Sequence, residues 1–163
     1  ASNGRTKFVI APHNIDSNQI NLMLKKLQKP TVLYSNYKNE TLENKSVFII
    51  DTVGLLTKIY SYADIAYIGG GMGSTGLHNT LEAATFGVPI VIGKNYQKFP
   101  EAKAMLTKGG LASIDSRLSL QKTLDRLVKN PEKRKELGQT NKDYITKNKG
   151  ATELVMAEIT TLY

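Results

Sequence analysis

The chain has 163 residues, which is enough for one domain with a hydrophobic core. Its 22 Lys and Arg against 14 Asp and Glu give a net charge of +8, which favours anionic partners such as phosphates. The absence of cysteine excludes disulfides and thiolate metal sites, and two histidines cannot alone build a structural zinc site. No apolar run approaches the roughly 20 residues that a membrane span needs. We therefore expect a soluble globular domain without a metal or other cofactor.

Short apolar runs alternate with helical patterns in the N-terminal part of the chain. Residues 1–7 are polar and lead straight into the first run, so we expect the chain to begin at a domain boundary. Asp16 or Ser17 can cap the first predicted helix, and the polar residues 35–45 predict a loop. The three predicted strands are residues 8–11, 31–34 and 47–50.

The central stretch, residues 64–93, predicts a strand, a glycine loop, a helix and a second strand. The strands are residues 65–68 and 88–92, and the helix, residues 78–86, ends at Gly87. Glycines in the loop allow positive φ and close approach of a ligand. Because the helix N-terminus faces the loop, its free N–H groups suit an anionic phosphate. The spacing is neither the dinucleotide fingerprint nor a GxxxxGK[ST] phosphate loop.

The remaining residues predict one more strand followed by helices. A loop at 94–100 precedes a helix at 101–108, and residues 111–114 form the last strand. Helices follow from Ser116, and Pro131 suits the first position of the second of them. The last predicted helix, residues 151–162, has apolar residues that should pack on another surface. The alternation predicts an α/β fold: a Rossmann-like, doubly wound parallel sheet of about six strands with helices on both faces.

The glycine loop and the helix after it resemble the donor-binding half of GT-B glycosyltransferases. The chain is more similar still to the 3-deoxy-D-manno-octulosonic acid (Kdo) transferases of lipopolysaccharide synthesis. They carry a GG loop, H-N-x-L-E, G-[IV]-P-[VI] and a glycine after the strand. The matching residues here are Gly69-Gly70, His78-Asn79-Thr80-Leu81-Glu82, Gly87-Val88-Pro89-Ile90 and Gly93. The resemblance implies that residues 1–163 are one donor-binding domain, the C-terminal half of a GT-B fold, with CMP-Kdo as the donor.

The resemblance gives Glu82 the leading role in the donor site. Its carboxylate would accept hydrogen bonds from the two ribose hydroxyls. The alternative is a capping box in which Asn79 is the N-cap and Glu82 the third helical residue, and the two roles are compatible. His78 would donate to the phosphate or to the Kdo carboxylate. Hydroxyls and N–H groups for the same anion would come from Ser74, Thr75 and Gly76.

Other candidates for the donor site lie outside the glycine loop. By resemblance, the corner at Gly54 and Leu55 abuts the nucleotide base, although Leu55 is alternatively a core residue in a plain turn. His13 stands where the family usually has arginine, so it is a weaker or pH-dependent donor, or an ordinary loop histidine. Lys94 and Lys98 follow a strand at the edge where ligands sit in open α/β sheets, or they are simply solvated.

One departure from the family pattern is Leu77, which replaces a second glycine before the histidine and makes the loop less free. No catalytic base is evident, and no metal cluster is visible. In the resembled family the base and the lipid A precursor site belong to an N-terminal domain, which is absent from these residues. The resemblance also implies that the full protein works at the cytoplasmic side of the bacterial inner membrane, against its anionic surface.

Two other readings of the sequence remain open. One is another GT-B enzyme that uses a UDP-sugar, either a transferase or an epimerase. The other is a non-catalytic basic module that binds nucleotides or nucleic acid. Scattered basic residues, an aromatic content of 7% and the lack of an RNA-stacking motif argue against nucleic acid.

Overall fold

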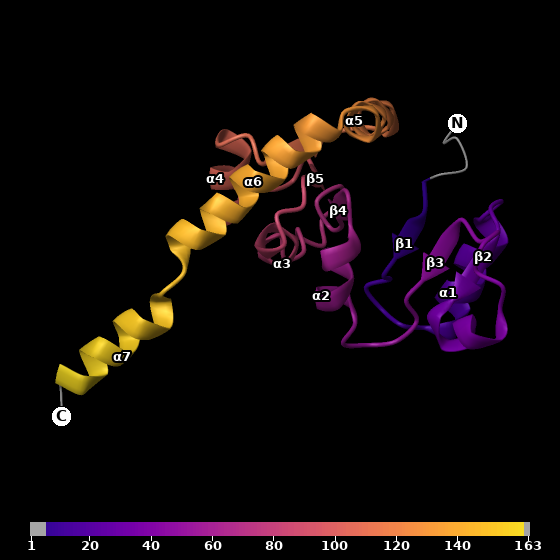
Figure 1. Ribbon diagram of the computed structural model, residues 1–163, viewed down its shortest axis with the longest axis horizontal. Helices are drawn as coiled ribbons and strands as arrows, with labels where there is room; N and C mark the ends of the chain where they lie inside the picture. Colours follow the sequence, from indigo (N-terminus) through magenta and orange to yellow (C-terminus); the bar gives the residue numbers. More distant parts are fainter. Residues whose placement is uncertain (1–5, 162–163) are drawn as a thin grey trace. The chain divides into compact units, whose positions relative to one another are not determined.

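A computed structural model describes residues 6–161 of the chain (Figure 1). The chain divides into two compact units, residues 1–59 and residues 60–163. Each unit holds one three-stranded parallel sheet. Most of the polar segment expected at a domain boundary, residues 1–7, lies outside the described residues, and so does Leu162 of the last predicted helix.

The N-terminal unit is built from short elements: β1 (Phe8–Ile10), α1 (Ser17–Lys26), β2 (Thr31–Leu33), the 3-10 helix η1 (Tyr34–Asn39), β3 (Val47–Ile49) and α2 (Leu56–Ile59). The strand order is β1-β3-β2, so β3 pairs with both of the others. Asp16 caps α1 by accepting a 2.8 Å hydrogen bond from the Gln19 N–H, which confirms one of the two predicted caps. The helix η1 occupies part of the predicted loop.

The C-terminal unit contains the central stretch and the helices after it. Its elements are η2 (Tyr60–Tyr62), β4 (Ala66–Ile68), α3 (Leu81–Thr85), β5 (Ile90–Gly93), α4 (Pro100–Thr107), β6 (Leu111–Ile114), α5 (Arg117–Lys129), α6 (Pro131–Asn148) and α7 (Ala151–Thr161). The strand order is β4-β5-β6. The bounds of β6 are those predicted, and Pro131 begins α6 as expected.

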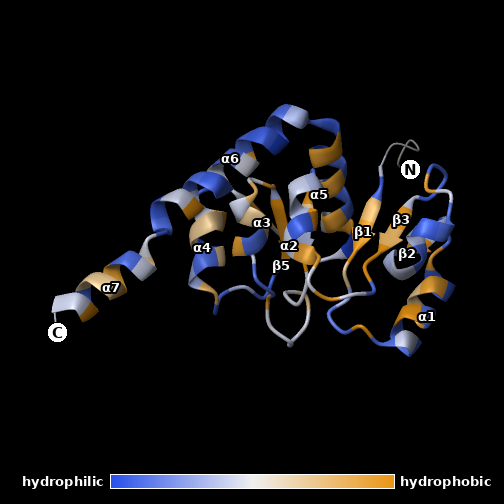
Figure 2. Cartoon of the chain, turned by 60° about the horizontal axis from the view of Figure 1, so that its bottom comes forward, coloured by the Kyte–Doolittle hydropathy of each residue, from blue (hydrophilic) through white to orange (hydrophobic). Residues whose placement is uncertain are grey.

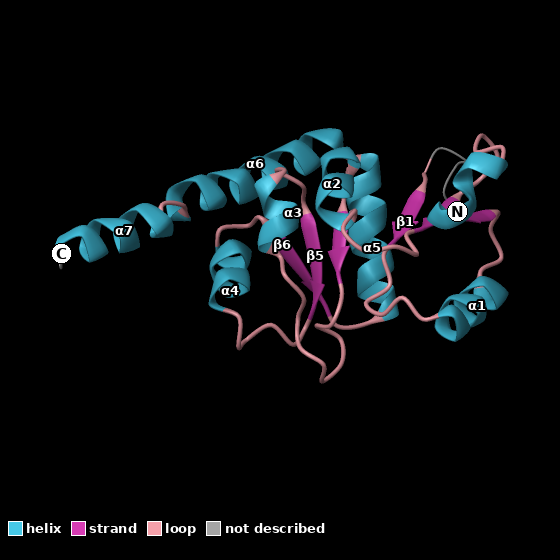
Figure 3. Cartoon of the chain, turned by 90° about the horizontal axis from the view of Figure 1, so that it is seen from below, coloured by secondary structure: helices cyan, strands magenta, loops and turns pink. Residues whose placement is uncertain are grey.

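The sheet of the C-terminal unit is covered on both faces (Figure 3). Successive side chains on a strand point to opposite sides. Ile90 and Ile92 of β5 therefore join a core with Met105 of α4, whereas Val91 packs with Leu127 of α5. Figure 2 shows that hydrophilic residues cover most of α6, in contrast to the hydrophobic strands of the sheet. Burial on both faces explains why the sequence of β5 is apolar throughout.

The expectation of a single sheet with about six strands is wrong, because the strands form two separate three-stranded sheets. The α/β class, the parallel pairing and the helices on both faces of the second sheet agree with the expectation. Alternating strands and helices predict parallel neighbours. They do not determine whether two groups of strands share a hydrogen-bonded edge, and strands of three or four residues offer few ladder bonds with which to do so.

The two last helices differ in how they pack. On α6, Asn141 is fully buried, and its Nδ2 donates to the Val88 carbonyl at 2.8 Å and to the Gly110 carbonyl at 2.9 Å. These bonds tie α6 to the segments that enter β5 and β6. In contrast, residues 151–161 of α7 are all exposed, with Leu154 at 76%, so the packing expected for this helix is not seen. Among the described residues, no helix has the length and apolar content to cross a bilayer.

Candidate functional site

The glycine loop after β4 folds back on itself. The His78 N–H donates to the Gly69 carbonyl at 3.1 Å, which closes the loop at its base. Gly70 has a φ of +85°, and a Cβ there would collide with the carbonyl oxygen of Gly76. Gly76 itself has a φ of +90°, and a Cβ there would lie 3.6 Å from Cζ of the Phe99 ring. Glycine at position 70 is therefore required both by the backbone conformation and by the close approach of the two sides of the loop.

A second set of contacts fixes the loop to the segment after β5. A Cβ on Gly93 would collide with the backbone of Gly71, so the backbones of these two segments are in contact. The Asn95 N–H donates to the Gly71 carbonyl at 2.8 Å, and the Asn95 Nδ2 donates to the Gly73 carbonyl at 2.9 Å. The sequence analysis missed Asn95, although it follows the strand at the edge where ligands are expected.

Leu77 and His78 have opposite environments. The Leu77 side chain is buried in the core of the C-terminal unit, so it anchors the end of the loop. His78 is exposed, and its imidazole lies against the backbone of Gly69 and Gly70. The replacement of glycine by leucine that marks this sequence therefore adds a hydrophobic anchor next to His78, where the loop is closed.

Asn79 organises the start of α3. Its Oδ1 accepts a 2.9 Å hydrogen bond from the Leu81 N–H, and its Nδ2 donates to Oε1 of Glu82 at 3.0 Å. Thr80 is the N-cap residue, so the helix begins at Leu81 and the predicted start at His78 is wrong. The capping box is not formed either, because Glu82 meets the side chain of Asn79 and not its backbone N–H. Asn79 instead holds the carboxylate of Glu82 in place.

Tyr60 is a further neighbour of Glu82 that the sequence analysis did not single out. It is half-buried against the core that contains Leu77 and Ala83. Burial raises the pKa of the Tyr60 phenol, and the negative charge of Glu82 raises it further. Tyr60 therefore stays protonated and neutral beside the carboxylate.

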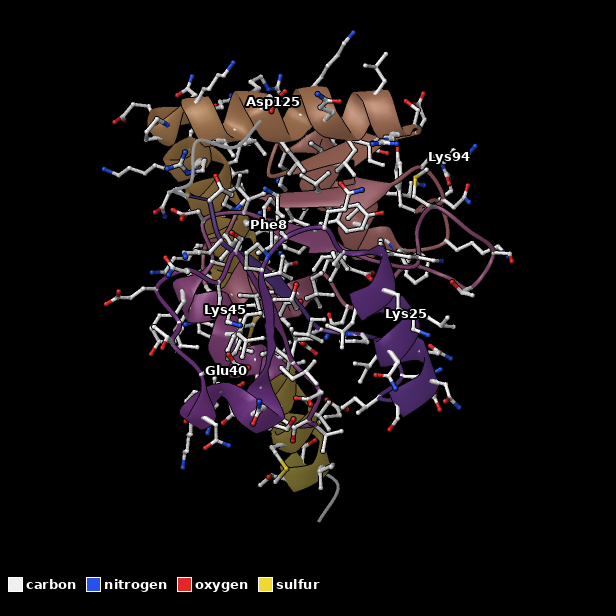
Figure 4. All side chains as sticks on the ribbon, turned by 90° about the vertical axis from the view of Figure 1, so that its right-hand side faces the viewer. Phe8, Lys25, Glu40, Lys45, Lys94 and Asp125 are labelled. Carbon is white, nitrogen blue, oxygen red and sulfur yellow. The ribbon has the colours of Figure 1, made fainter. Side chains whose placement is uncertain are left out.

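Two lysines stand in the loop between β5 and α4. Figure 4 shows Lys94 among the loops at this end of the sheet, and both Lys94 and Lys98 are exposed. Hydrogen bonds from Ser119 and Ser116 lower the pKa of Asp115, and the positive charge of Lys94 lowers it further. Lys94 thus has an acidic residue in its surroundings, and Lys98 is the lysine predicted to meet the donor.

The structure distributes the predicted site residues over both units. The C-terminal unit holds seven of them, all in the glycine loop, the start of α3 or the loop before α4: Ser74, Thr75, Gly76, His78, Asn79, Glu82 and Lys98. Of these, Asn79 and Glu82 are in direct contact, whereas Ser74 and Thr75 are exposed in the loop.

The N-terminal unit holds the other three. His13 follows β1, and Gly54, with a φ of +84°, follows β3. The carboxyl ends of parallel strands meet at one edge of a sheet, so these residues belong to the same edge. Leu55 is half-buried and directly precedes α2, and its carbonyl accepts hydrogen bonds from the N–H groups of Lys58 and Ile59 in that helix.

The acidic and histidine side chains do not gather into a metal centre in residues 6–161, where no group of three or more could hold an ion. The polar groups at the glycine loop are backbone N–H groups, hydroxyls, an imidazole and a lysine. Such groups donate hydrogen bonds, so this end of the sheet can hold an anion, while the carboxylate of Glu82 can accept from hydroxyls.

Comparison with known proteins identifies relatives of the chain. No protein-family model matches it. It is 32% identical over 116 residues to the 3-deoxy-D-manno-octulosonic acid transferase of Haemophilus influenzae, covering 70% of this chain and 27% of the relative. It is also 32% identical over 130 residues to a probable mitochondrial 3-deoxy-D-manno-octulosonic acid transferase of Arabidopsis thaliana, covering 77% and 29%. The chain thus spans less than a third of the length of these relatives.

The fold also has a counterpart among solved structures. The crystal structure of the C-terminal CMP-Kdo binding domain of WaaA from Acinetobacter baumannii superposes with a TM-score of 0.78 at 18% identity, covering 88% of this chain and 76% of that one. This structural match shows that the fold is shared. The sequence relatives are Kdo transferases, a kind of glycosyltransferase, so the chain is related in sequence to these enzymes, which confirms the resemblance drawn from the glycine loop and the HNTLE stretch.

Proposed function

We propose that this chain is the donor-binding part of a Kdo transferase and that it holds CMP-Kdo for transfer to a lipid A precursor. The observation that carries the proposal is the 32% identity to Kdo transferases over 116 residues. The similarity of the fold to a CMP-Kdo binding domain supports it, and so does the cluster of polar groups at the glycine loop. All ten predicted site residues are proposed as donor contacts: His13, Gly54, Leu55, Ser74, Thr75, Gly76, His78, Asn79, Glu82 and Lys98.

The ribose is assigned to Glu82. A carboxylate can accept from both hydroxyls of a vicinal diol, and hydrogen bonds to a charged group are stronger than neutral ones. Asn79 already holds one carboxylate oxygen at 3.0 Å, so part of the ordering entropy is lost before the ligand arrives.

The phosphate and the sugar carboxylate are assigned to the glycine loop and its neighbours. The helix α3 has only five residues, so its dipole contributes less than the sequence suggested. The hydrogen-bond donors and the positive charge that bind the anion must therefore come from other groups. These are the loop N–H groups, the hydroxyls of Ser74 and Thr75, the imidazole of His78 and the ammonium of Lys98. Gly54 and Leu55 are the candidates for the nucleotide base, and His13 is a candidate for a weaker or pH-dependent hydrogen bond to the phosphate or the sugar carboxylate, as the family resemblance implies.

The rest of the enzyme follows from the same proposal. The acceptor and the catalytic base belong to an N-terminal domain beyond these 163 residues. The whole protein acts at the cytoplasmic side of the bacterial inner membrane, where the net charge of +8 on these 163 residues favours approach to anionic lipid. These residues bind a nucleotide sugar and not nucleic acid.

Nucleotide preference tests the proposal directly. We expect CMP to bind the chain more tightly than UMP, UDP or a short oligonucleotide, measured by NMR titration of the ¹⁵N-labelled chain. The largest changes in amide chemical shift should occur at residues 69–82. Preferred binding of UDP would favour a UDP-sugar enzyme, and preferred binding of the oligonucleotide would contradict a glycosyltransferase site altogether.

A further inference from the structure

Asn95 makes two hydrogen bonds to one face of the glycine loop. Its backbone N–H reaches the Gly71 carbonyl at 2.8 Å, and its side-chain Nδ2 reaches the Gly73 carbonyl at 2.9 Å. The Asn95 side chain is exposed and lies outside both hydrophobic clusters of the unit. Its bonds therefore act on the direction of two carbonyls and contribute nothing to the packing of the core.

The direction of a carbonyl fixes the direction of the next N–H group. In a planar trans peptide the C=O and the following N–H point opposite ways. No described peptide bond is cis, so the Met72 and Ser74 N–H groups point away from Asn95. Within residues 6–161 neither of these N–H groups donates a hydrogen bond. Two unused backbone donors are thus turned to the side of the loop opposite Asn95.

Neighbouring contacts fix the carbonyl of Gly71 but leave the carbonyl of Gly73 able to rotate. Gly71 is buried, and its backbone touches that of Gly93, so its carbonyl cannot turn freely. Gly73 is exposed, and a Cβ there would meet nothing within 4 Å. The Nδ2 of Asn95 is consequently the group that limits rotation of the peptide between Gly73 and Ser74.

We propose that Asn95 is a positioning residue, whose side chain holds the Ser74 N–H group toward the phosphate of the donor, next to the Met72 N–H group that the contact with Gly93 already fixes. This inference rests on the proposed function, because it assumes that the glycine loop receives a phosphate. The oriented N–H groups of the loop would then bind the anion in place of the weak dipole of α3. In this proposal Asn95 acts on the ligand only through the loop.

The test compares CMP with cytidine, which lacks the phosphate. The variants are Asn95→Ala and, as a matched control from the same loop, Gln97→Ala, whose side chain accepts only from the adjacent Tyr96 N–H. Loss of one hydrogen bond in Asn95→Ala should raise the Kd for CMP about three- to tenfold, with the Kd for cytidine unchanged. The Ser74 amide should become more mobile in ¹⁵N relaxation, while the melting temperature stays near that of the wild type. Gln97→Ala should leave both affinities and the Ser74 amide unchanged.

Each other outcome contradicts the inference in a recognisable way. Wild-type affinity for CMP in Asn95→Ala would show that the orientation of the loop does not depend on this side chain. An equal loss of CMP and cytidine affinity, or a large fall in melting temperature, would show a general structural role. A wild-type chain that binds cytidine and CMP equally would overturn the phosphate site and leave the nucleoside site standing. If the wild-type chain binds neither, the proposed function fails, and the role of Asn95 fails with it.

Discussion

Glu82 combines an internal contact with a free approach from solvent. Its Oε1 accepts from Asn79, yet the residue is only half-buried and lies at the start of a five-residue helix. The structure excludes the capping box that would have given this carboxylate a purely local task. What remains is a carboxylate held by one hydrogen bond from Asn79 at the edge of the glycine loop, with acceptor capacity left for the diol of the proposed ribose contact.

We expect Glu82→Ala to weaken CMP binding, and Glu82→Gln to weaken it less. Hydrogen bonds to a charged group are worth roughly 1.5–3 kcal/mol, and glutamine keeps one acceptor oxygen. Calorimetric titration with CMP gives the affinities, and thermal unfolding of the same samples gives the stability. A lower melting temperature with unchanged CMP affinity would instead assign Glu82 to the stability of the helix start.

The pKa of the Tyr60 phenol depends on burial and on the charge of Glu82, which gives a second prediction. Burial and then Glu82 raise the pKa of this phenol. A raised pKa in the folded state means that the contribution to stability is complete below the unfolded pKa, about 10, and is lost as pH rises through the folded pKa. We expect Glu82→Gln to bring the pKa of Tyr60 back toward the ordinary value without reaching it, because the burial remains.

The pKa of Tyr60 can be followed by ¹³C NMR of the ring Cζ, with Tyr60→Phe to assign the resonance. An unchanged pKa in Glu82→Gln would mean that the carboxylate is too far away to act on the phenol. The larger shift expected from burial should persist in both proteins.

At the scale of elements, local patterns predicted some parts of the fold well and contacts between distant residues poorly. Apolar runs located the strands, and the bounds of β6 were correct because Gly109-Gly110 and Asp115 enclose a short run. The start of α3 was misplaced by three residues, because Asn79 bonds the Leu81 N–H through its side chain and keeps residues 78–80 out of the helix. Asn95 could not be found, since its partners lie more than 20 positions earlier and nothing in its own neighbourhood indicates them.

Contact between α3 and α6 gives a prediction at this scale. A Cβ on Gly138 would collide with the Gly87 carbonyl, so the backbone of α6 lies close to the backbone of the turn that follows α3. Glycine to alanine in a helix interior normally stabilises. At this position we expect Gly138→Ala to destabilise the chain by about 1–3 kcal/mol, because the helix must move outward. Urea unfolding measures the change, and Thr146→Ala, exposed on the same helix, should be near neutral. Greater stability of Gly138→Ala would contradict the close contact.

For the whole molecule, the sequence predicted the class of fold but not the division of its sheet. The parallel strands, the helices on both faces of the C-terminal sheet and the loops at the carboxyl ends of the strands all follow from the alternating pattern. The division into two units at residues 59 and 60 does not follow from this pattern. Whether the two groups of strands share one sheet depends on hydrogen bonds between edge strands, which no local pattern encodes. The seven candidates in residues 74–98 nevertheless share one unit, so the predicted anion site does not depend on that break.

The last prediction is that the chain binds the donor but does not catalyse transfer. Transfer requires the donor carbon, the acceptor hydroxyl and a base in one geometry, and much of the rate comes from that positioning. Among the described residues at the glycine loop, the carboxylate of Glu82 is already engaged with Asn79, and Glu101 lies in the first turn of α4. Each carboxylate therefore has another role, and we expect neither to take a proton from an acceptor.

Incubation with CMP-Kdo and a lipid A precursor, with release of CMP as the readout, tests this. A reaction without acceptor subtracts spontaneous breakdown of the donor, and the full-length Haemophilus influenzae relative provides a positive control. We expect no acceptor-dependent release from the 163-residue chain, although CMP should still bind it. Release at an enzyme-like rate would require a base within these residues. Glu82→Gln would then be the first variant to assay, since a base converted to an amide loses turnover while the neutral hydrogen bond to the ribose is retained.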